Sequence, residues 1–117
     1  MKKSKTVLIS VFDKRKILNF AKALESSGYK IIATDGTGSE LAKHNIGYMP
    51  AEKITKNPKG FDDCIKTISF RIQAGILFDR LNSAHIRQAT KLKVDKIDMV
   101  VCNFVTLEKA VKKLADF

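Results

Sequence analysis

The chain has 117 residues, of which 44% are hydrophobic and 29% are charged, and these proportions are typical of a globular protein with one core. No apolar run approaches the roughly 20 residues that a membrane-spanning helix needs. The basic start leads into an apolar run that is too short for a signal peptide. The two cysteines and two histidines show no metal-ligand spacing. We therefore expect one cytoplasmic domain over residues 1–117, with reduced thiols and no metal.

The net charge of +10 is high for a chain of this size. Three explanations fit it: a solvated basic surface, a nucleotide or phosphate ligand, or nucleic acid. The lysines are spread along the chain, and no aromatic residues are interleaved with them as a base-stacking platform requires. This pattern makes nucleic acid the least favoured partner and leaves the other two explanations open.

The first 34 residues predict a strand, a helix and a second strand. Residues 6–10 form a short and nearly continuous apolar run, which is typical of a strand buried on both faces. Asp13 is placed to cap a helix that Gly28 ends, and residues 30–34 resemble the first strand in composition. Such a unit forms a right-handed crossover. The apolar face of its helix repeats at helical spacing through Ile17, Phe20, Ala21 and Leu24.

A capping box marks the start of the next helix, because Thr37 is followed three residues later by Glu40. Residues 45–47 end that helix. Residues 48–54 predict a third strand, which Pro50 cuts short, and a basic loop over residues 53–60 follows.

The second half continues the alternation of strands and helices. Residues 62–71 predict a turn of helix with an irregular loop, residues 74–78 a fourth strand, and residues 98–102 a fifth. A helix over residues 83–92 turns Ile86 and Ala89 inward, and Thr106 caps a last helix. The predicted fold is therefore a three-layer α/β domain, with a parallel five-stranded sheet and helices on both faces. Ligands of such sheets bind beyond the carboxyl ends of the strands.

The turn after the second predicted strand is the strongest candidate for a binding site. Gly36 and Gly38 allow a ligand to approach the backbone, and the amides at a helix start attract an anion. The hydroxyls of Thr34, Thr37 and Ser39 are able to donate to phosphate oxygens. The turn matches neither the dinucleotide fingerprint nor the P-loop. A capped helix after a glycine turn, with no ligand, is the alternative interpretation.

Two further segments carry candidate side chains. Ser10 and Lys14 bracket the turn after the first strand, which lies next to the glycine turn in a crossover unit, so Lys14 could meet the same phosphate. A surface lysine is the alternative interpretation. Lys66 and Thr67 lie between apolar residues, and a partly desolvated lysine is able to donate a proton or stabilise an oxyanion.

Four segments, in the same order, resemble one enzyme family. They read LISVFDK at residues 8–14, IATDGT at 32–37, IKTISFRIQAGIL at 65–77 and IDMVVCNF at 97–104. The chain is similar along nearly its whole length to the IMP cyclohydrolase domain of the bifunctional purine-biosynthesis enzyme, which has the methylglyoxal-synthase-like fold. The resemblance implies that fold for this chain.

The resemblance also implies a reaction that needs no cofactor or metal, in which a formylated imidazole carboxamide ribotide closes to IMP. Lys66 would assist the formyl oxygen as it leaves, with Thr67 and Asn103 beside it in the catalytic pocket. Thr67, Cys102 and Asn103 would line the base and ribose part of that pocket. The phosphate would be held by the hydroxyl, ammonium and glycine groups of Ser10, Lys14, Thr34, Gly36 and Thr37.

The chain departs from the family pattern at several positions. The family has arginine at the position of Cys64, histidine-proline at Ser69–Phe70 and tyrosine at Val105. A family aspartate and a second lysine would follow Phe117, as would the formyltransferase domain. Two hypotheses therefore stay open: an IMP cyclohydrolase, or a catalytically degenerate module that binds a phosphorylated metabolite and has a regulatory role. Family members pair, so we expect a homodimer, with a separate formyltransferase as a further partner.

Overall fold

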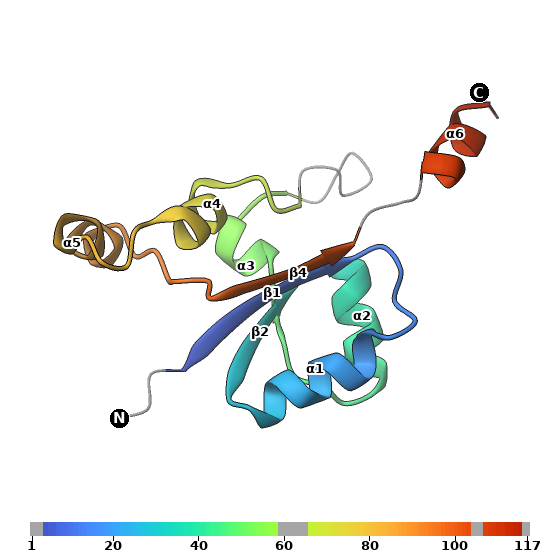
Figure 1. Ribbon diagram of the computed structural model, residues 1–117, viewed down its shortest axis with the longest axis horizontal. Coiled ribbons are helices and arrows are strands. Elements are labelled where there is room, and N and C mark those ends of the chain that lie inside the picture. The colour runs from blue at the N-terminus through green and yellow to red at the C-terminus, as the bar shows by residue number, and fades with distance from the viewer. Residues whose placement is uncertain (1–3, 59–65, 104–106, 116–117) are drawn as a thin grey trace.

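The computed structural model describes residues 4–58, 66–103 and 107–115 of the chain. In these residues a parallel sheet lies between two layers of helices (Figure 1). The sheet has four strands in the order β3-β2-β1-β4. They are β1 (Lys5–Val11), β2 (Tyr29–Ala33), β3 (Met49–Pro50) and β4 (Met99–Asn103).

Strand β1 is central because apolar side chains leave it in both directions. Val7, Leu8 and Ile9 are 0–3% exposed, so each face of the strand is covered. The strand pairs in parallel with β2 on one side and β4 on the other, where Leu8 is opposite Ile32 and Val100. The apolar run in the sequence therefore predicted this strand correctly.

Two helices cover one face of the sheet: α1 (Ile17–Ser26) and α2 (Asp35–Lys43). Their apolar sides meet alternate residues of β1, as the period of two along a strand requires. Figure 1 shows both helices on the same side of the strands. The buried residues of this layer are Val7, Ile9, Val11, Ile17, Ala21, Leu24, Ile31, Ala33, Leu41 and Ile46.

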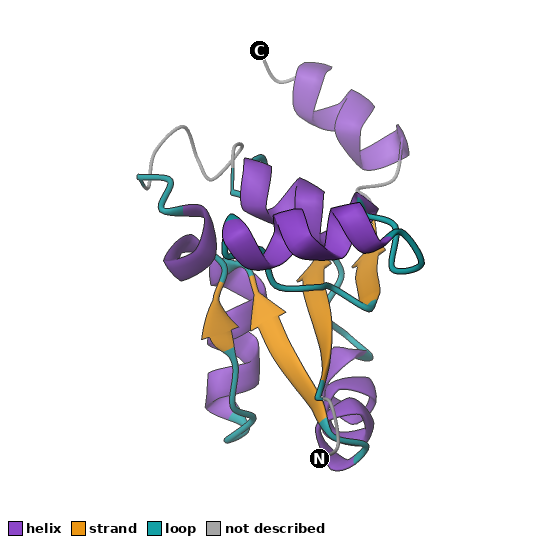
Figure 2. Ribbon diagram, turned by 90° about the vertical axis from the view of Figure 1, so that its left-hand side faces the viewer, coloured by secondary structure: helices purple, strands orange, loops and turns teal. Residues whose placement is uncertain are grey.

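The opposite face is covered by α3 (Glu52–Thr55) and α4 (Phe70–Leu77). Helix α5 (Ser83–Lys91) lies beyond α4, and α6 (Leu107–Ala115) follows β4 (Figures 1 and 2). No helix in the described part of the chain is both long enough and apolar enough to cross a membrane. The second core, smaller than the first, consists of Leu8, Ile32, Ala51, Ile72 and Ile97.

The prediction of a strand over residues 74–78 is wrong, because these residues belong to α4 and its end. The described sheet accordingly has four strands, where the sequence predicted five. The third strand is also shorter than expected, since α3 begins two residues after Pro50. Gly75 shows why α4 fits here: a Cβ on it would lie 2.5 Å from the Asp95 carbonyl oxygen. The missing side chain lets the helix pack against the segment that leads into β4.

Two of the predicted helix caps are also wrong. Helix α2 begins earlier than the capping box predicted, with Thr34 as its N-cap and no side-chain cap bond. Asp13 does not cap α1, whose N-cap is Lys16. Helix α5 was predicted correctly, and Ala89 is buried, but Ile86 is 46% exposed. The predicted cap at position 106 lies outside the described residues.

One arginine connects the end of α4 to the start of β4. The Arg80 guanidinium donates to the carbonyl oxygens of Gly75 at 2.7 Å and Ile97 at 2.8 Å, and also to those of Ile76 and Phe78. It lies 4.1 Å from the centroid of the Phe78 ring. The last carbonyls of a helix have no partners within the helix. Arg80 supplies those partners at α4 and holds the helix against the sheet.

We expect Arg80→Met to lower the free energy of unfolding by about 2–3 kcal/mol, because several partly buried carbonyls lose a charged donor. Urea unfolding monitored by circular dichroism measures the change. Arg87→Met on the exposed side of α5 is the matched control, with an expected change within about 0.5 kcal/mol. Equal effects of the two substitutions would contradict this role for Arg80.

Candidate phosphate-binding site

The carboxyl ends of β1 and β2 bring two predicted hydroxyl groups together. Thr34 Oγ1 donates to Ser10 Oγ at 3.1 Å, and the Thr34 amide donates to the Ile9 carbonyl at 3.4 Å. Thr34 is only 3% exposed, while Ser10 is partly exposed. The parallel pairing of the two strands places both residues at the same edge of the sheet, as the crossover predicted.

Thr37 joins the start of α2 to the end of β1. Its Oγ1 accepts a hydrogen bond from the Val11 amide at 3.1 Å, and the side chain is 1% exposed. The hydroxyl predicted as a helix cap thus satisfies a backbone group of the neighbouring strand. This contact holds the first turn of α2 beside the turn that follows β1.

Lys14 reaches across to that first turn of α2. Its Nζ donates to the Val11 carbonyl at 3.0 Å and to the Phe12 carbonyl at 3.3 Å. A Cβ on Gly36 would lie 3.5 Å from Lys14 Cε and 3.7 Å from Nζ, so the ammonium group lies over the backbone of Gly36. The first backbone bond of this helix runs from the Gly38 amide to the Thr34 carbonyl at 2.7 Å.

Two sources of positive charge therefore lie side by side. The amides at Gly36 and Thr37 precede the first intrahelical donor, so they are available to a ligand, and the helix dipole adds to their field. The Lys14 ammonium group adds a full charge next to them. Asp35 is exposed, as expected for a carboxylate that would oppose an anion. This arrangement is suited to holding phosphate or another small anion.

The acidic residue of the β1–α1 turn is neutralised within that turn. Asp13 accepts hydrogen bonds from the Arg15 side chain and from the Arg15 amide, and the two side chains form an ion pair. These hydrogen bonds and the guanidinium charge lower the pKa of Asp13 to about 2. The Asp13 carboxylate is therefore ionised and paired with Arg15 at neutral pH. Because Asp13 pairs with Arg15 and not with Lys14, the positive charge of Lys14 remains available to attract an anion.

Asn103 lies at the end of β4, and its side chain closes the same turn. Its Oδ1 accepts from the Phe12 amide at 2.6 Å and from the Asp13 amide at 2.9 Å. Its Nδ2 donates to the Asp13 carbonyl at 2.9 Å. The sequence predicted a catalytic role for Asn103, but its polar atoms bind the backbone of the turn that carries Lys14. No local pattern in the sequence indicates this long-range contact.

The structure does not bring all the predicted site residues together. Cys102 is opposite Ser10 in the register of β4 and β1, and it is exposed. Lys66 is exposed and Thr67 is half-buried, and both precede the N-cap of α4. Within the described residues, no hydrogen bond joins them to the hydroxyl cluster, by which we mean the side chains of Ser10, Thr34 and Thr37. That cap is Ser69, whose Oγ accepts from the Ile72 amide at 3.1 Å. Positions 64 and 105 lie outside the described residues.

Comparison with known proteins identifies the fold family. The family model described as "MGS-like domain" matches residues 16–116, which is most of the chain. The chain belongs to the MGS-like domain family. This finding confirms the family resemblance seen in the sequence. A crystal structure of ForH superposes on the MGS-like domain with a TM-score of 0.79 and 25% identity, covering 90% of this chain and 55% of that one.

Curated relatives of this MGS-like domain carry the name bifunctional purine biosynthesis protein PurH. The protein from Fusobacterium nucleatum is 40% identical over 113 residues, which are 97% of this chain and 22% of the relative. The protein from Ruminiclostridium cellulolyticum is 38% identical over 109 residues (93% and 21%), and that from Cutibacterium acnes 36% over 110 residues (94% and 21%). The chain spans about a fifth of the length of these relatives.

We expect Asn103→Ala to raise the hydrogen-exchange rates of the Phe12 and Asp13 amides about tenfold, because each loses its acceptor. Amide exchange followed by NMR measures this effect. Asn103→Asp is the matched variant, since it keeps the accepting oxygen, and both amides should remain protected. Unchanged exchange in the alanine variant would show that Asn103 does not hold the turn.

Proposed function

We propose that this MGS-like domain acts in purine nucleotide biosynthesis and closes a formylated imidazole carboxamide ribotide to IMP. The observation that carries the proposal is the anion site at the carboxyl ends of β1 and β2, where the Lys14 ammonium group lies over Gly36. A ribotide carries a phosphate that suits such a site. The similarity to PurH proteins, over more than nine-tenths of the chain, supports this substrate.

In the proposed reaction, the carboxamide nitrogen attacks the formyl carbon and forms the new carbon–nitrogen bond. The formyl oxygen then leaves as water, with one proton from the carboxamide nitrogen and one from the formamide nitrogen. The phosphate site would fix one end of the substrate and so help to orient the two groups for an attack that is already intramolecular. Lys66, as an exposed cation, would stabilise charge on the formyl oxygen and donate a proton to it, and would recover that proton from the carboxamide nitrogen.

The second candidate function is a phosphate- or nucleotide-binding module with a regulatory role and no turnover. The observation that favours it is the use of Thr37 and Asn103 as backbone partners, which leaves few free acid–base groups at the described site. The anion site itself is the same in both proposals. Measuring whether the protein converts the formylated ribotide to IMP distinguishes the two proposals.

For the enzyme, we expect purified protein to form IMP from the formylated ribotide faster than the uncatalysed reaction, as followed by absorbance. Lys66→Met should lower kcat about a hundredfold, because the departing oxygen loses its donor. Lys14→Met should mainly raise KM, about tenfold, since its charge acts on the phosphate. The exposed Lys22→Met on α1 is the matched control and should leave both constants unchanged. If no IMP formed above the uncatalysed rate, the enzyme proposal would be wrong and the binding module would be the remaining proposal.

Gly36→Ala tests the anion site without relying on catalysis. The added Cβ would be in ordinary van der Waals contact with Lys14, so the fold should persist, but the methyl group would occupy the space beside the amides. Calorimetry with IMP and inorganic phosphate should show binding weakened about tenfold or more relative to the native chain. Ala42→Ser, on the exposed side of α2 and away from its first turn, is the control and should leave the affinity unchanged. Equal affinities in Gly36→Ala and the native chain would place the ligand elsewhere.

A further inference from the structure

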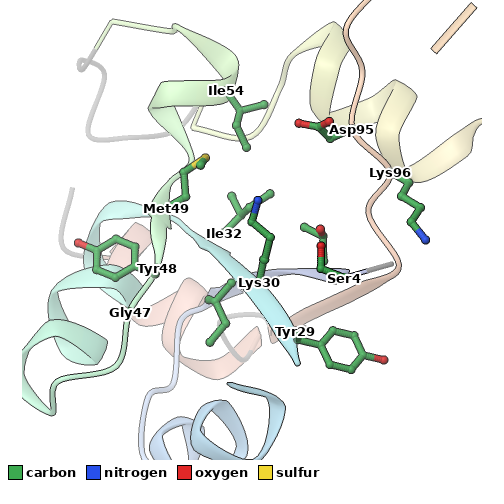
Figure 3. A pocket seen from close by; sticks show the side chains of 12 residues that line it. Ser4, Tyr29, Lys30, Ile32, Gly47, Tyr48, Met49, Ile54, Asp95 and Lys96 are labelled. Carbon is green, nitrogen blue, oxygen red and sulfur yellow. The ribbon is translucent and has the colours of Figure 1, made fainter. Parts of the chain in front are cut away.

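A second group of cations lies away from the carboxyl ends of β1 and β2, around a cavity of about 380 Å³ between α3 and α4. Its apolar residues are Ile32, Met49, Ile54 and Ile97. A larger cavity of about 490 Å³ adjoins it, because Ile32, Met49, Ile54 and Asp95 line both. Figure 3 shows this larger space, with Ile54, Met49, Asp95 and the Lys30 ammonium group facing it.

Four positive side chains line the smaller cavity, and they come from different parts of the fold. Lys53 belongs to α3 and Lys56 ends it, Arg71 lies in the first turn of α4, and Lys93 follows α5. Asp95 is the only carboxylate among the described residues that line this cavity. None of the four cations forms an ion pair with a carboxylate of the described residues. Four positive charges and one negative charge give this described lining a net charge of +3.

The backbone positions two of these lysines in an unusual way. Lys56 and Lys93 both have φ of +57°, in the left-handed region where glycine or asparagine is usual. A hydrogen bond holds the backbone of Lys93 in place, because Arg71 Nη1 donates to the Lys93 carbonyl oxygen at 2.8 Å. The fold thus accepts backbone strain at two positions and mutual repulsion among the cations. An anion bound in the cavity would offset that repulsion.

We propose that this cavity is a second anion site, which binds a small molecule with a diphosphate group and an apolar or aromatic body. The four cations bind the diphosphate, whose charge of about −3 in a nucleoside diphosphate balances the +3 of the described lining residues. The body extends over Met49 and Ile54 into the adjoining cavity. The two volumes together fall in the size range of sites for small ligands. This proposal is independent of the IMP cyclohydrolase proposal.

The experiment titrates the isotope-labelled full chain at about 150 mM salt with ADP, with inorganic pyrophosphate and with adenosine, and follows the amide signals by NMR. ADP should shift the amides of Lys53, Lys56, Lys93 and Ile97 in a saturable way, more tightly than pyrophosphate or adenosine alone. Signals from Gly36 and Thr37 report on the other anion site in the same spectra. Failure of one site is therefore distinguishable from failure of the other.

The residues with a left-handed backbone conformation also provide matched variants. Lys56→Gly and Lys93→Gly remove charge while relieving the backbone, so both variants should fold, and each should weaken ADP about tenfold. Asn45→Gly makes the same backbone change outside the cavity, at φ +59°, and should leave the affinity unchanged.

Three results would overturn the proposal. One is the absence of saturable shifts at the cavity amides up to about 10 mM ADP, which corresponds to a binding free energy weaker than about 3 kcal/mol. Another is equal ADP affinity in the lysine variants and the native chain. The third is tighter binding of a generic single-stranded RNA to the same amides, which would assign the cations to nucleic acid.

Discussion

The hydrogen bonds that satisfy the backbone just beyond the end of β1 determine the arrangement of the whole candidate site. Strand pairing ends near Val11, yet the amides at Val11, Phe12 and the following residue still need acceptors. Thr37 from α2 and Asn103 from β4 provide them. The first turn of α2, the end of β4 and the turn that carries Lys14 are thereby joined at one edge of the sheet.

This use of side chains defines what remains for a ligand. Thr37 and Asn103 resemble groups that could contact substrate, but their oxygens are engaged by backbone amides. The amides at the start of α2 and the positive charge of Lys14 remain for a ligand, although Lys14 Nζ also donates to the Val11 and Phe12 carbonyls. A site of this kind is suited to holding a phosphate and contributes little proton transfer. The chemistry of a ring closure would then depend on Lys66, outside the hydroxyl cluster.

The sequence predicted two kinds of element correctly: a strand whose two faces are both buried, and a helix whose apolar residues repeat at helical spacing. Strand β1 was predicted correctly because three successive apolar residues are buried on alternating faces, which no amphipathic helix produces. Helix α5 followed from the helical spacing of Ile86 and Ala89, although only Ala89 is buried. The run at residues 74–78 was predicted wrongly because a short continuous apolar run suits a buried strand and a segment of a packed helix equally. Only tertiary packing, at Gly75 against the Asp95 carbonyl, distinguishes them.

Side-chain partners across the sheet were harder to predict than elements. The sequence pointed to Ser10, Thr34 and Lys14 as neighbours, because a crossover unit places the ends of adjacent parallel strands together. The pattern at Thr37 favoured a helix cap, although its hydroxyl bonds a strand 26 residues away. The contact of Asn103 with the β1–α1 turn spans 90 and 91 residues. Such contacts depend on the register of β1 and β4, which local sequence does not encode.

The excess of positive charge, which the sequence left without a single explanation, divides into different roles in the structure. Arg15 is paired with Asp13 and Lys96 with Asp98, so these charges are compensated. Lys14 and the cations of the α3–α4 cavity have no carboxylate within ion-pair distance among the described residues. An unpaired cation on an open surface is solvated at little cost, but several around one cavity raise its potential.

The two proposed anion sites are connected through β2, since Ile32 of this strand lines the cavity and Thr34, which follows the strand, donates to Ser10. Both residues are at most 5% exposed. An anion bound at one proposed site would reduce the electrostatic attraction of the other site for a second anion. Salt screens that effect over about 8 Å under physiological conditions. Any such coupling between the two sites should therefore weaken as the salt concentration rises.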